Sequence, residues 1–471
     1  MNKTLLAVLA MTACLTLAAR EKMNVLFIMA DDLNTHLGCY DHYLVQTPNI
    51  DKLASKGALF TRAYCQFPLC GPSRASLLTG LRPEKTNMCI NETDFRDALP
   101  EVVTLPQLFK RNGYFSGRVG KIFHQGLPMD NGPDGYDDAV SWNARVNPLG
   151  RDKTEVEKVI NYSPGVSLGV APAFLAAEGS DLEQTDGMVA TETIKMLAEH
   201  KDKPFFIAAG FFRPHCPYIS PKKYFDLYSL DSIKLPVLPA GDSGNVPPLA
   251  RANNVKGRDR LTVEQQKNLH RAYFAAISFV DAQVGRLLQA LDDLGLSENT
   301  IVVFMGDNGY HLGEHRLWGK FVLFEEAARV PLIIYHPKIR PAAKKIDQPV
   351  ELLDVYPTLA SWTGLNPPVG LDRKSMDSLY GNRSAEWKKA ALSVVSRPAG
   401  KFDRSKVNWG YAYRGASVRT DRWRYTEWDK GEAGAELYDH LNDPGESTNL
   451  IGVPGHSEII KTLRAYLEPG K

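Results

Sequence analysis

The sequence predicts an α/β protein in which a mainly parallel sheet lies between helices, followed by a small α+β region with antiparallel strands. Continuous apolar runs, which lack the alternation of a half-exposed strand, indicate strands buried on both faces. Segments with apolar residues at spacings of three and four lie between these runs and indicate helices. After about residue 371, short aromatic runs bounded by turn signals replace both patterns and indicate antiparallel strands.

Four apolar runs are the predicted strands of the main sheet, and each leads into polar residues suited to chemistry. The runs cover 25–30, 115–119, 205–209 and 301–305. The polar residues that follow them are Asp31, Asp32, Lys121, His124, Arg213, His215, Asp307 and Asn308. In parallel sheets, ligands bind outside the carboxyl ends of the strands. We therefore expect these residues to meet at one edge of the sheet and to form a site.

The clearest predicted helix spans about 262–294, where apolar residues recur at helical spacing. Thr262 followed by Gln265 is typical of a capping box, and Gly295 supplies a stop signal. Further helices are expected over 49–55, 104–111, 181–199 and 354–363. The stretch 229–260 is rich in Pro, Gly, Asn and Asp and predicts a long loop, with a position over the site as one interpretation.

The C-terminal part predicts a separate small unit. Short strands are expected over 410–414 and 422–425, and a final helix over 457–467. The stretch 436–439 precedes a turn signal. Asn442-Asp443-Pro444-Gly445 is a turn signal. We divide the chain into a signal peptide (1–20), a catalytic domain (23–375) and a C-terminal subdomain (376–471).

The first 20 residues have the layout of a bacterial export signal. Lys3 precedes an apolar run over 5–17, and small residues follow at Ala18 and Ala19. We expect an exported protein, periplasmic or extracellular. A buried N-terminal helix and lipid attachment at Cys14 are the alternatives, although the residues before Cys14 make a weak lipoprotein signal. No later segment offers about 18 uninterrupted apolar residues, so we expect no membrane span.

Charge and cysteine content limit the possible partners. The net charge of +2 does not recruit a polyanion, so we expect no nucleic-acid partner, and attraction for an anionic substrate must be local. Five cysteines remain after removal of a signal peptide, at positions 39, 65, 70, 89 and 216. An odd count leaves at least one thiol outside any intramolecular disulfide, and no pair has the spacing of a zinc motif.

The most specific segment is residues 70–80, CGPSRASLLTG. Pro72 suits the first turn of a helix and Gly80 suits its end, which places Cys70 at the helix N-terminus. Backbone N–H groups and the helix dipole favour an anion there, and Arg74 lies one turn further on. From Cys70 and Arg74 alone, a buried cysteine beside a structural arginine is an equally good interpretation.

The full segment resembles the signature of the type I sulfatase family, in which the cysteine is oxidised to Cα-formylglycine. The resemblance extends over nearly the whole mature chain. It includes the early Asp-Asp pair, the 120–124 box, Asp307-Asn308-Gly309, Lys320, the 436–439 segment and Asp443-Pro444. It implies an alkaline-phosphatase-like fold and maturation of Cys70 by a formylglycine-generating or anaerobic sulfatase-maturating enzyme.

The resemblance also implies a role for each site residue. One Ca²⁺ would be bound by oxygen donors, which are Asp31, Asp32, Asp307, Asn308 and the matured residue 70. The hydrated aldehyde would attack sulfur, with His215 protonating the leaving alcohol and His124 driving breakdown of the sulfated intermediate. The charge on the sulfuryl group would be neutralised by Arg74, Lys121 and Lys320.

Within the family, several segments resemble the iduronate-2-sulfatase branch. They are 37–40, 47–51, 119–124, 212–217 and 312–315 with Trp318. Position 308 departs from that branch, because it is Asn here and His there. The sequence therefore leaves open whether the substrate is a sulfated uronate from glycosaminoglycan or another sulfated sugar.

Two other functions stay open at this point. One is a phosphate or phosphonate ester hydrolase of the same superfold, and the other is an inactive carbohydrate-binding protein. The intact set of predicted catalytic residues argues against the second. His36, His311 and His315 are interpreted as structural, with a sugar pocket as the alternative for the last two. Tyr310 and Trp318 fit either the core or a sugar platform.

Overall fold

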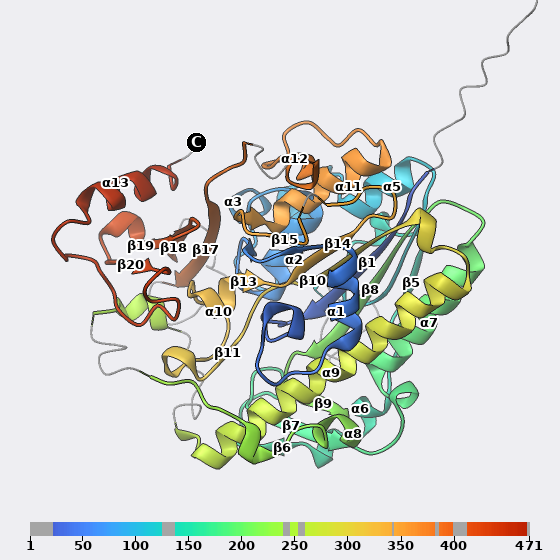
Figure 1. Ribbon diagram of the computed structural model, residues 1–471, viewed down its shortest axis with the longest axis horizontal. Helices are drawn as coiled ribbons and strands as arrows, with labels where there is room; N and C mark the ends of the chain where they lie inside the picture. Colours follow the sequence, from blue (N-terminus) through green and yellow to red (C-terminus); the bar gives the residue numbers. More distant parts are fainter. Residues whose placement is uncertain are drawn as a thin grey trace, which may run out of the picture.

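An eight-stranded sheet runs through the computed structural model, which describes residues 22–124, 137–238, 245–252, 260–341, 343–381, 386–398 and 412–468 (Figure 1). The strand order is β15-β2-β14-β10-β1-β8-β4-β5. Their bounds are β1 (Asn24–Asp31), β2 (Ala58–Phe60), β4 (Phe115–Gly120), β5 (Ala144–Val146), β8 (Phe205–Pro214), β10 (Thr300–Gly306), β14 (Leu332–Tyr335) and β15 (Lys345–Ile346). The predicted signal peptide, with Cys14, lies outside the described residues.

The four predicted strands are confirmed and lie side by side. They are β10, β1, β8 and β4, and each pairs with its neighbour in parallel. Antiparallel pairing occurs where β14 joins β10 and β2. The sheet is therefore mainly parallel around β1, and the carboxyl ends of these four strands open on the same edge.

Alternate residues of β1 enter two different cores, as expected for a strand buried on both faces. Leu26 and Ile28 pack on the side of α1 (Pro48–Lys56), α7 (Thr185–His200) and α9 (Val263–Asp293). Val25 and Phe27 pack on the side of α2 (Cys70–Thr79), α5 (Leu105–Arg111) and α11 (Val355–Thr363). Figure 1 shows these two helix layers on opposite sides of the sheet. The predicted α/β sandwich is confirmed.

The long helix α9 begins and ends within one residue of the predicted bounds 262–294. Thr262 and Gln265 form the predicted capping box of α9, and Gly295 follows the helix with a φ of +70°. The other predicted helices correspond to α1, α5, α7 and α11. In the predicted loop 229–260, the described residues include the 3₁₀ turns Leu230–Ser232 and Pro248–Arg251.

The C-terminal region forms its own antiparallel sheet, β17-β18-β19-β20, beside the main sheet (Figure 1). The strands are β17 (Ala391–Pro398), β18 (Ala412–Arg419), β19 (Trp423–Trp428) and β20 (Ala435–Asp439), followed by α13 (Ser457–Ala465). Trp428 and Tyr438 share a buried apolar cluster with Val322 and Phe324 of the main part. Residues 410 and 411 of the first predicted strand lie outside the described residues.

Shorter elements connect these layers. They are β3 (Ala63–Tyr64), β13 (Arg329–Val330) and β16 (Val350–Glu351) in one small sheet, β6 (Ile160–Asn161), β7 (Ala173–Ala177) and β9 (Tyr218–Pro221) in another, the hairpin of β11 (His311–Leu312) and β12 (Trp318–Gly319), and the helices α3 (Pro83–Thr86), α4 (Phe95–Ala98), α6 (Arg151–Thr154), α8 (Lys222–Phe225), α10 (Glu325–Ala328) and α12 (Asp377–Gly381). Among the described residues, no helix has the length and apolarity needed to cross a bilayer.

The five described cysteines are all free thiols.

Candidate active site

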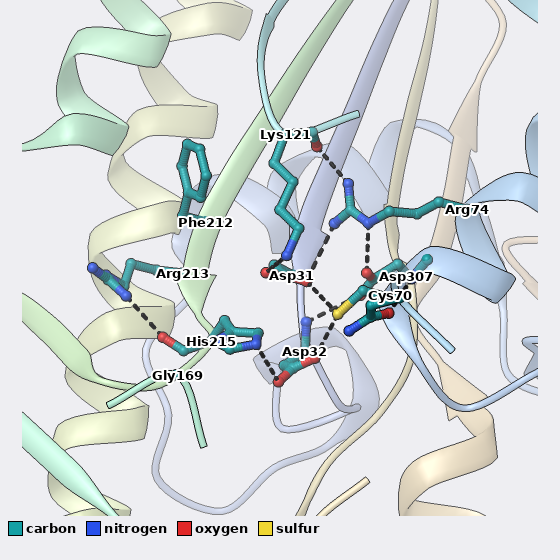
Figure 2. Close-up of polar contacts among 12 residues, drawn as sticks. Asp31, Asp32, Cys70, Arg74, Lys121, Gly169, Phe212, Arg213, His215 and Asp307 are labelled. Atoms are coloured by element: carbon teal, nitrogen blue, oxygen red, sulfur yellow. Dashed lines mark hydrogen bonds and ion pairs between the residues drawn. The ribbon is translucent and has the colours of Figure 1, made fainter. Parts of the chain in front are cut away.

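Most of the polar residues predicted to meet at the sheet edge lie around Cys70 (Figure 2). Arg213 does not, because its guanidinium turns away to Asp152 and to the carbonyls of His215 and Pro217. Asp31 ends β1, Lys121 follows β4, His215 follows β8, and Asp307 follows β10. Cys70 comes from the opposite direction, as the first residue of α2. All five side chains are buried.

Cys70 owes its position to the ends of α2. Leu69 is extended, the helix begins at Cys70, and Gly80 ends it in the left-handed region with a φ of +70°. The Cys70 Sγ atom lies 3.1 Å from Asp31 Oδ1 and 2.6 Å from the Nζ atom of Lys320. Burial and the charge of Asp31 raise the pKa of the Cys70 thiol well above its ordinary value, so the unmodified thiol is a poor nucleophile.

Asp31 is surrounded by cations. Its carboxylate lies 2.6 Å from Lys121 Nζ and 3.4 Å from Arg74 Nη2. Burial by itself would raise the pKa of Asp31, but Lys121, His215 and Arg74 together hold that pKa well below its ordinary value. Asp31 is therefore a permanent anion at the centre of the site.

The backbone of Asp32 is held in an uncommon conformation. Its φ is +60°, in the left-handed region that side chains other than glycine rarely occupy. The Asp32 N–H donates to Asp307 Oδ1 at 3.0 Å, and the Tyr273 hydroxyl donates to the Asp32 carbonyl at 2.6 Å. These bonds aim the Asp32 side chain at the site. Tyr273 lies within the predicted helix 262–294, and nothing in its helical pattern marks the hydroxyl.

The guanidinium of Arg74 is held by several acceptors in the buried part of the site. Its Nε atom lies 2.6 Å from Asp307 Oδ2, and its Nη1 atom donates to the carbonyls of Lys121 and Ile122 at 2.5 and 3.0 Å. The guanidinium is fully buried, so it neutralises the acidic cluster and links α2 to the residues after β4. The predicted contact of Arg74 with a sulfuryl group remains a prediction.

The acidic cluster fits a hard divalent cation. Oxygen atoms of Asp31, Asp32 and Asp307 all lie within 4.8 Å of one another. Asp32 Oδ2 and Asn308 Oδ1 are buried and have no hydrogen-bond partner among the described residues. Burial raises the pKa of Asp307 to about 6, against the opposing charge of Arg74. A donor set of oxygen atoms alone, with two of them unsatisfied, suits Ca²⁺.

The two predicted histidines occupy different environments. His215 Nε2 lies 3.6 Å from Asp32 Oδ2, and its Nδ1 atom lies 2.6 Å from the Cys216 carbonyl oxygen. Burial lowers the pKa of His215, but Asp32 and Asp31 outweigh burial and raise it. His124 is half-buried, and burial together with Lys121 lowers its pKa well below the ordinary value. His215 is thus set up to carry a proton and His124 to remain neutral.

Lys320 reaches the site from the end of the β11–β12 hairpin. Its Nζ atom contacts both Cys70 Sγ and Asp32 Oδ1. His311 and His315, in the same hairpin, point elsewhere: both are buried, and both face Glu326 of α10. Glu326 was not among the predicted residues, because a glutamate in a short amphipathic segment gives no signal in the sequence.

The Sulfatase family profile matches residues 23–365, which is most of the chain. The chain belongs to the sulfatase family. A second profile, N-sulphoglucosamine sulphohydrolase, C-terminal, matches residues 313–470 of the sulfatase. Membership of this family makes the protein a sulfuric ester hydrolase.

Relatives cover almost the whole sulfatase. It is 32% identical to a sulfatase of Formosa agariphila, over 95% of this chain and 86% of the relative. It is 34% identical to human (Homo sapiens) iduronate 2-sulfatase, over 94% of both chains. Among solved structures, phosphonate monoester hydrolase of Agrobacterium radiobacter superposes with a TM-score of 0.76 and 25% identity, over 95% of both chains. The sulfatase therefore has the alkaline-phosphatase-like α/β fold, as predicted.

One large cavity of the sulfatase lies away from this site. It measures about 1150 Å³ and lies between β15 and α13, where Trp387, Trp423 and Tyr466 contribute to its wall. It contains none of the residues that surround Cys70. The candidate active site is therefore assigned from its chemistry, because its strands, charges and unsatisfied oxygen atoms converge on one buried atom.

Proposed function

We propose that the sulfatase hydrolyses a sulfate ester on a carbohydrate, with Cys70 matured to formylglycine as the nucleophilic residue. The observation that carries this proposal is the position of Cys70 Sγ, buried at a helix N-terminus 3.1 Å from Asp31 and 2.6 Å from Lys320. The high pKa of the thiol argues against attack by the unmodified cysteine. Its Sγ atom marks where the oxygen atoms of the matured residue would lie.

The bound groups would supply two kinds of chemistry. Ca²⁺ would be held by Asp31, Asp32, Asp307 and Asn308, and would favour the ionised form of a hydroxyl and bind a sulfate oxygen. Formylglycine, as its hydrate, would supply that hydroxyl as the nucleophile. Both assignments rest on the donor set and on the family.

Cationic side chains of the protein would stabilise the negative charge that develops at the reacting atoms. Lys320 contacts Cys70 Sγ, so its ammonium can donate a hydrogen bond to a group bound at position 70. Lys121 lies against Asp31 and adds positive charge on the other side. Such fixed donors, aimed at a region that gains negative charge, stabilise the transition state in a buried site.

His215 is proposed as the acid that protonates the leaving alcohol. Its Nδ1–H donates to the Cys216 carbonyl, which leaves Nε2 directed toward Asp32 and the site. A proton on Nε2 is stabilised by the neighbouring carboxylates. His124, whose low pKa keeps it neutral, is proposed as the base that restores the aldehyde after sulfate transfer.

A sulfated uronate is the proposed substrate class, with another sulfated sugar as the alternative. The similarity to iduronate 2-sulfatase over 94% of both chains supports the uronate. Asn308, where that branch carries His, keeps the alternative open. A panel of defined sulfated mono- and disaccharides tests the proposal. Turnover of 2-O-sulfated uronates above all other members is expected, and turnover of sulfated hexosamines alone would contradict it.

A phosphate or phosphonate ester hydrolase is the second candidate function, supported by the fold shared with phosphonate monoester hydrolase. A comparison of aryl sulfate, aryl phosphate and aryl phosphonate esters on one preparation separates the two. A higher kcat/KM for the sulfate ester is expected. A higher kcat/KM for either phosphorus ester would instead favour the second candidate.

Export and maturation complete the proposal. The layout of residues 1–20 supports a periplasmic or extracellular enzyme that meets a maturating enzyme as its partner. Mass spectrometry of the peptide over residues 63–74, from cells that contain such a partner, should show loss of the Cys70 thiol and gain of an aldehyde. A fully active preparation with only cysteine at position 70 would refute the mechanism.

A further inference from the structure

A second group of metal-ligating side chains lies outside the active site, between the hairpin that leads to Lys320 and α10. It consists of His311 in β11, His315 in the following turn, and Glu326 in α10. His311 is fully buried and His315 is 3% exposed. One ligand atom from each residue lies within 4.8 Å of the other two.

The hydrogen bond at the far side of the His311 ring fixes which nitrogen faces Glu326. Nδ1 of His311 lies 3.2 Å from the Gly319 carbonyl oxygen, which can only accept a hydrogen bond. In the neutral ring the proton therefore sits on Nδ1, and the Nε2 lone pair faces Glu326 Oε2 at 3.4 Å. Two acceptors facing each other repel unless a cation lies between them.

A proton shared by His311 and Glu326 fits these contacts poorly. Charge-assisted N–H···O bonds are about 2.7–2.9 Å long, and the observed separation is 3.4 Å. Both His311 Nε2 and Glu326 Oε2 are buried without a hydrogen-bond partner among the described residues. No described lysine or arginine forms an ion pair with Glu326.

The distance between His311 and Glu326 matches the requirement of a tetrahedral metal ion. Zinc binds histidine nitrogen and carboxylate oxygen at about 2.0–2.2 Å, so two ligands at a tetrahedral angle lie about 3.4 Å apart. His311 Nε2 and Glu326 Oε2 have this separation, and His315 Nε2 lies 4.0 Å from the same oxygen. The bond from His311 Nδ1 to a backbone carbonyl is also the outer contact typical of metal-bound histidine.

We propose that His311, His315 and Glu326 bind one divalent transition-metal ion of the zinc class, with water as the remaining ligand. Two nitrogen donors and one carboxylate suit zinc better than calcium. The ion would tie β11 and the turn at His315 to α10, on either side of Lys320. The turn is already constrained, because His315 and Arg316 both have φ values in the left-handed region, 52° and 58°. The site does not depend on the proposed sulfate chemistry.

Zinc binding to the full-length protein tests this proposal. Protein stripped with a chelator and reloaded with excess Ca²⁺ should bind about one Zn²⁺ per chain, measured by calorimetry and elemental analysis. Co²⁺ in its place should give the visible absorption of a tetrahedral site. His311→Ala should weaken zinc binding at least about 100-fold, because it removes a direct ligand.

Matched variants keep the outcome decisive. Glu326→Gln preserves shape and should also weaken zinc binding, with folding checked by circular dichroism. His440→Ala should leave zinc binding unchanged, because His440 lies beside Glu446, whose charge Arg424 already neutralises. Asp307→Ala, which alters the active-site cluster, should also retain zinc. Absence of zinc binding in wild-type protein, or binding that survives His311→Ala in a folded variant, would overturn the proposal.

Discussion

Two buried clusters of carboxylates differ in how the protein satisfies them. Around Cys70, Asp32 Oδ2 and Asn308 Oδ1 have no hydrogen-bond partner among the described residues. At the junction with the C-terminal sheet, Glu325 and Glu446 are bound by Arg424, with Arg419 3.1 Å from Glu325 and His440 2.7 Å from Glu446. The second cluster is complete without a ligand, whereas the first is not.

This difference separates a functional site from a structural one. A buried carboxylate requires a cation, and at Glu446 the chain supplies that cation as a guanidinium fixed by β19. At Asp32 and Asn308, oxygen atoms stay available for an ion from solution. Changes in the Cys70 cluster should therefore reduce activity first, and changes in the Glu446 cluster should reduce stability first.

The largest expected effect is the loss of the nucleophilic residue. Cys70→Ala should reduce sulfatase kcat at least about 10⁴-fold, because no other group at position 70 can form the covalent intermediate. Its thermal unfolding should remain cooperative, since the alanine methyl fits within the volume of the cysteine. Activity of Cys70→Ala within tenfold of the matured wild type would show that the cluster acts without this residue.

Metal removal should separate the two clusters most clearly. Chelation should abolish activity, and Ca²⁺ should restore it, because the Cys70 cluster has unsatisfied oxygen atoms, whereas Arg424 already binds both carboxylates of the Glu446 cluster. Asp307→Ala should lose both the calcium and the thermal stabilisation that calcium gives. Calorimetric titration with Ca²⁺ measures the binding, and thermal unfolding with and without Ca²⁺ measures the stabilisation. Glu446→Gln serves as the control and should bind calcium normally.

His215→Ala should affect substrates according to their leaving group. If His215 protonates the leaving oxygen, sugar sulfates should lose about 10²–10⁴-fold in kcat, and aryl sulfates much less. His124→Ala should instead slow both classes and let a sulfated enzyme accumulate, as seen by intact-protein mass spectrometry. Equal losses on both classes for His215→Ala would transfer the acid role to another residue, with Lys320 the first to test.

Breaking the second cluster should cost stability and spare chemistry. Glu446→Gln leaves Arg424 buried with one partner fewer and should lower the free energy of unfolding by about 3–5 kcal/mol. Urea denaturation measures this loss, and kcat under native conditions should stay close to wild type. Asp226→Asn, in the exposed pair with Lys222, is the matched control and should change stability by less than about 1 kcal/mol. A larger fall in kcat than in stability would mean that the cluster shapes the active site.

The smallest expected effect is a pH dependence of that stability. Although burial opposes it, Arg424 and His440 hold the pKa of Glu446 at about 2, below its unfolded value. Its contribution is therefore present above the unfolded pKa of about 4.3 and is lost as pH falls through 4 toward 2. Burial raises the pKa of the nearby Glu436 to about 7, so its contribution is lost as pH rises from about 4.3 through 7.

Chemical denaturation between pH 3 and pH 8 should show both effects. Glu446→Gln should flatten the acid side of the stability profile, and Glu436→Gln should flatten the neutral side. An unchanged acid side in Glu446→Gln would mean that other carboxylates dominate acid unfolding.

The sequence by itself determined the four central strands of the sheet, the main helices beside it, and most of the residues that lie around Cys70. Apolar runs such as 25–30 encode burial on both faces, and the position of Asp31 after such a run places it at the carboxyl end of a strand. Local signals such as Thr262 with Gln265 also fixed the end of a helix, because a capping box acts within one turn of the chain.

Only the tertiary structure decided which charges meet. Tyr273 holds the Asp32 backbone across 241 positions, and His311 faces Glu326 because a hairpin folds against α10. Arg74 takes Asp307 and two carbonyls as partners, which no local pattern specifies. Such contacts depend on the packing of whole layers, since a side chain's partners are set by strand order and register, and neither property is encoded within a single turn or strand.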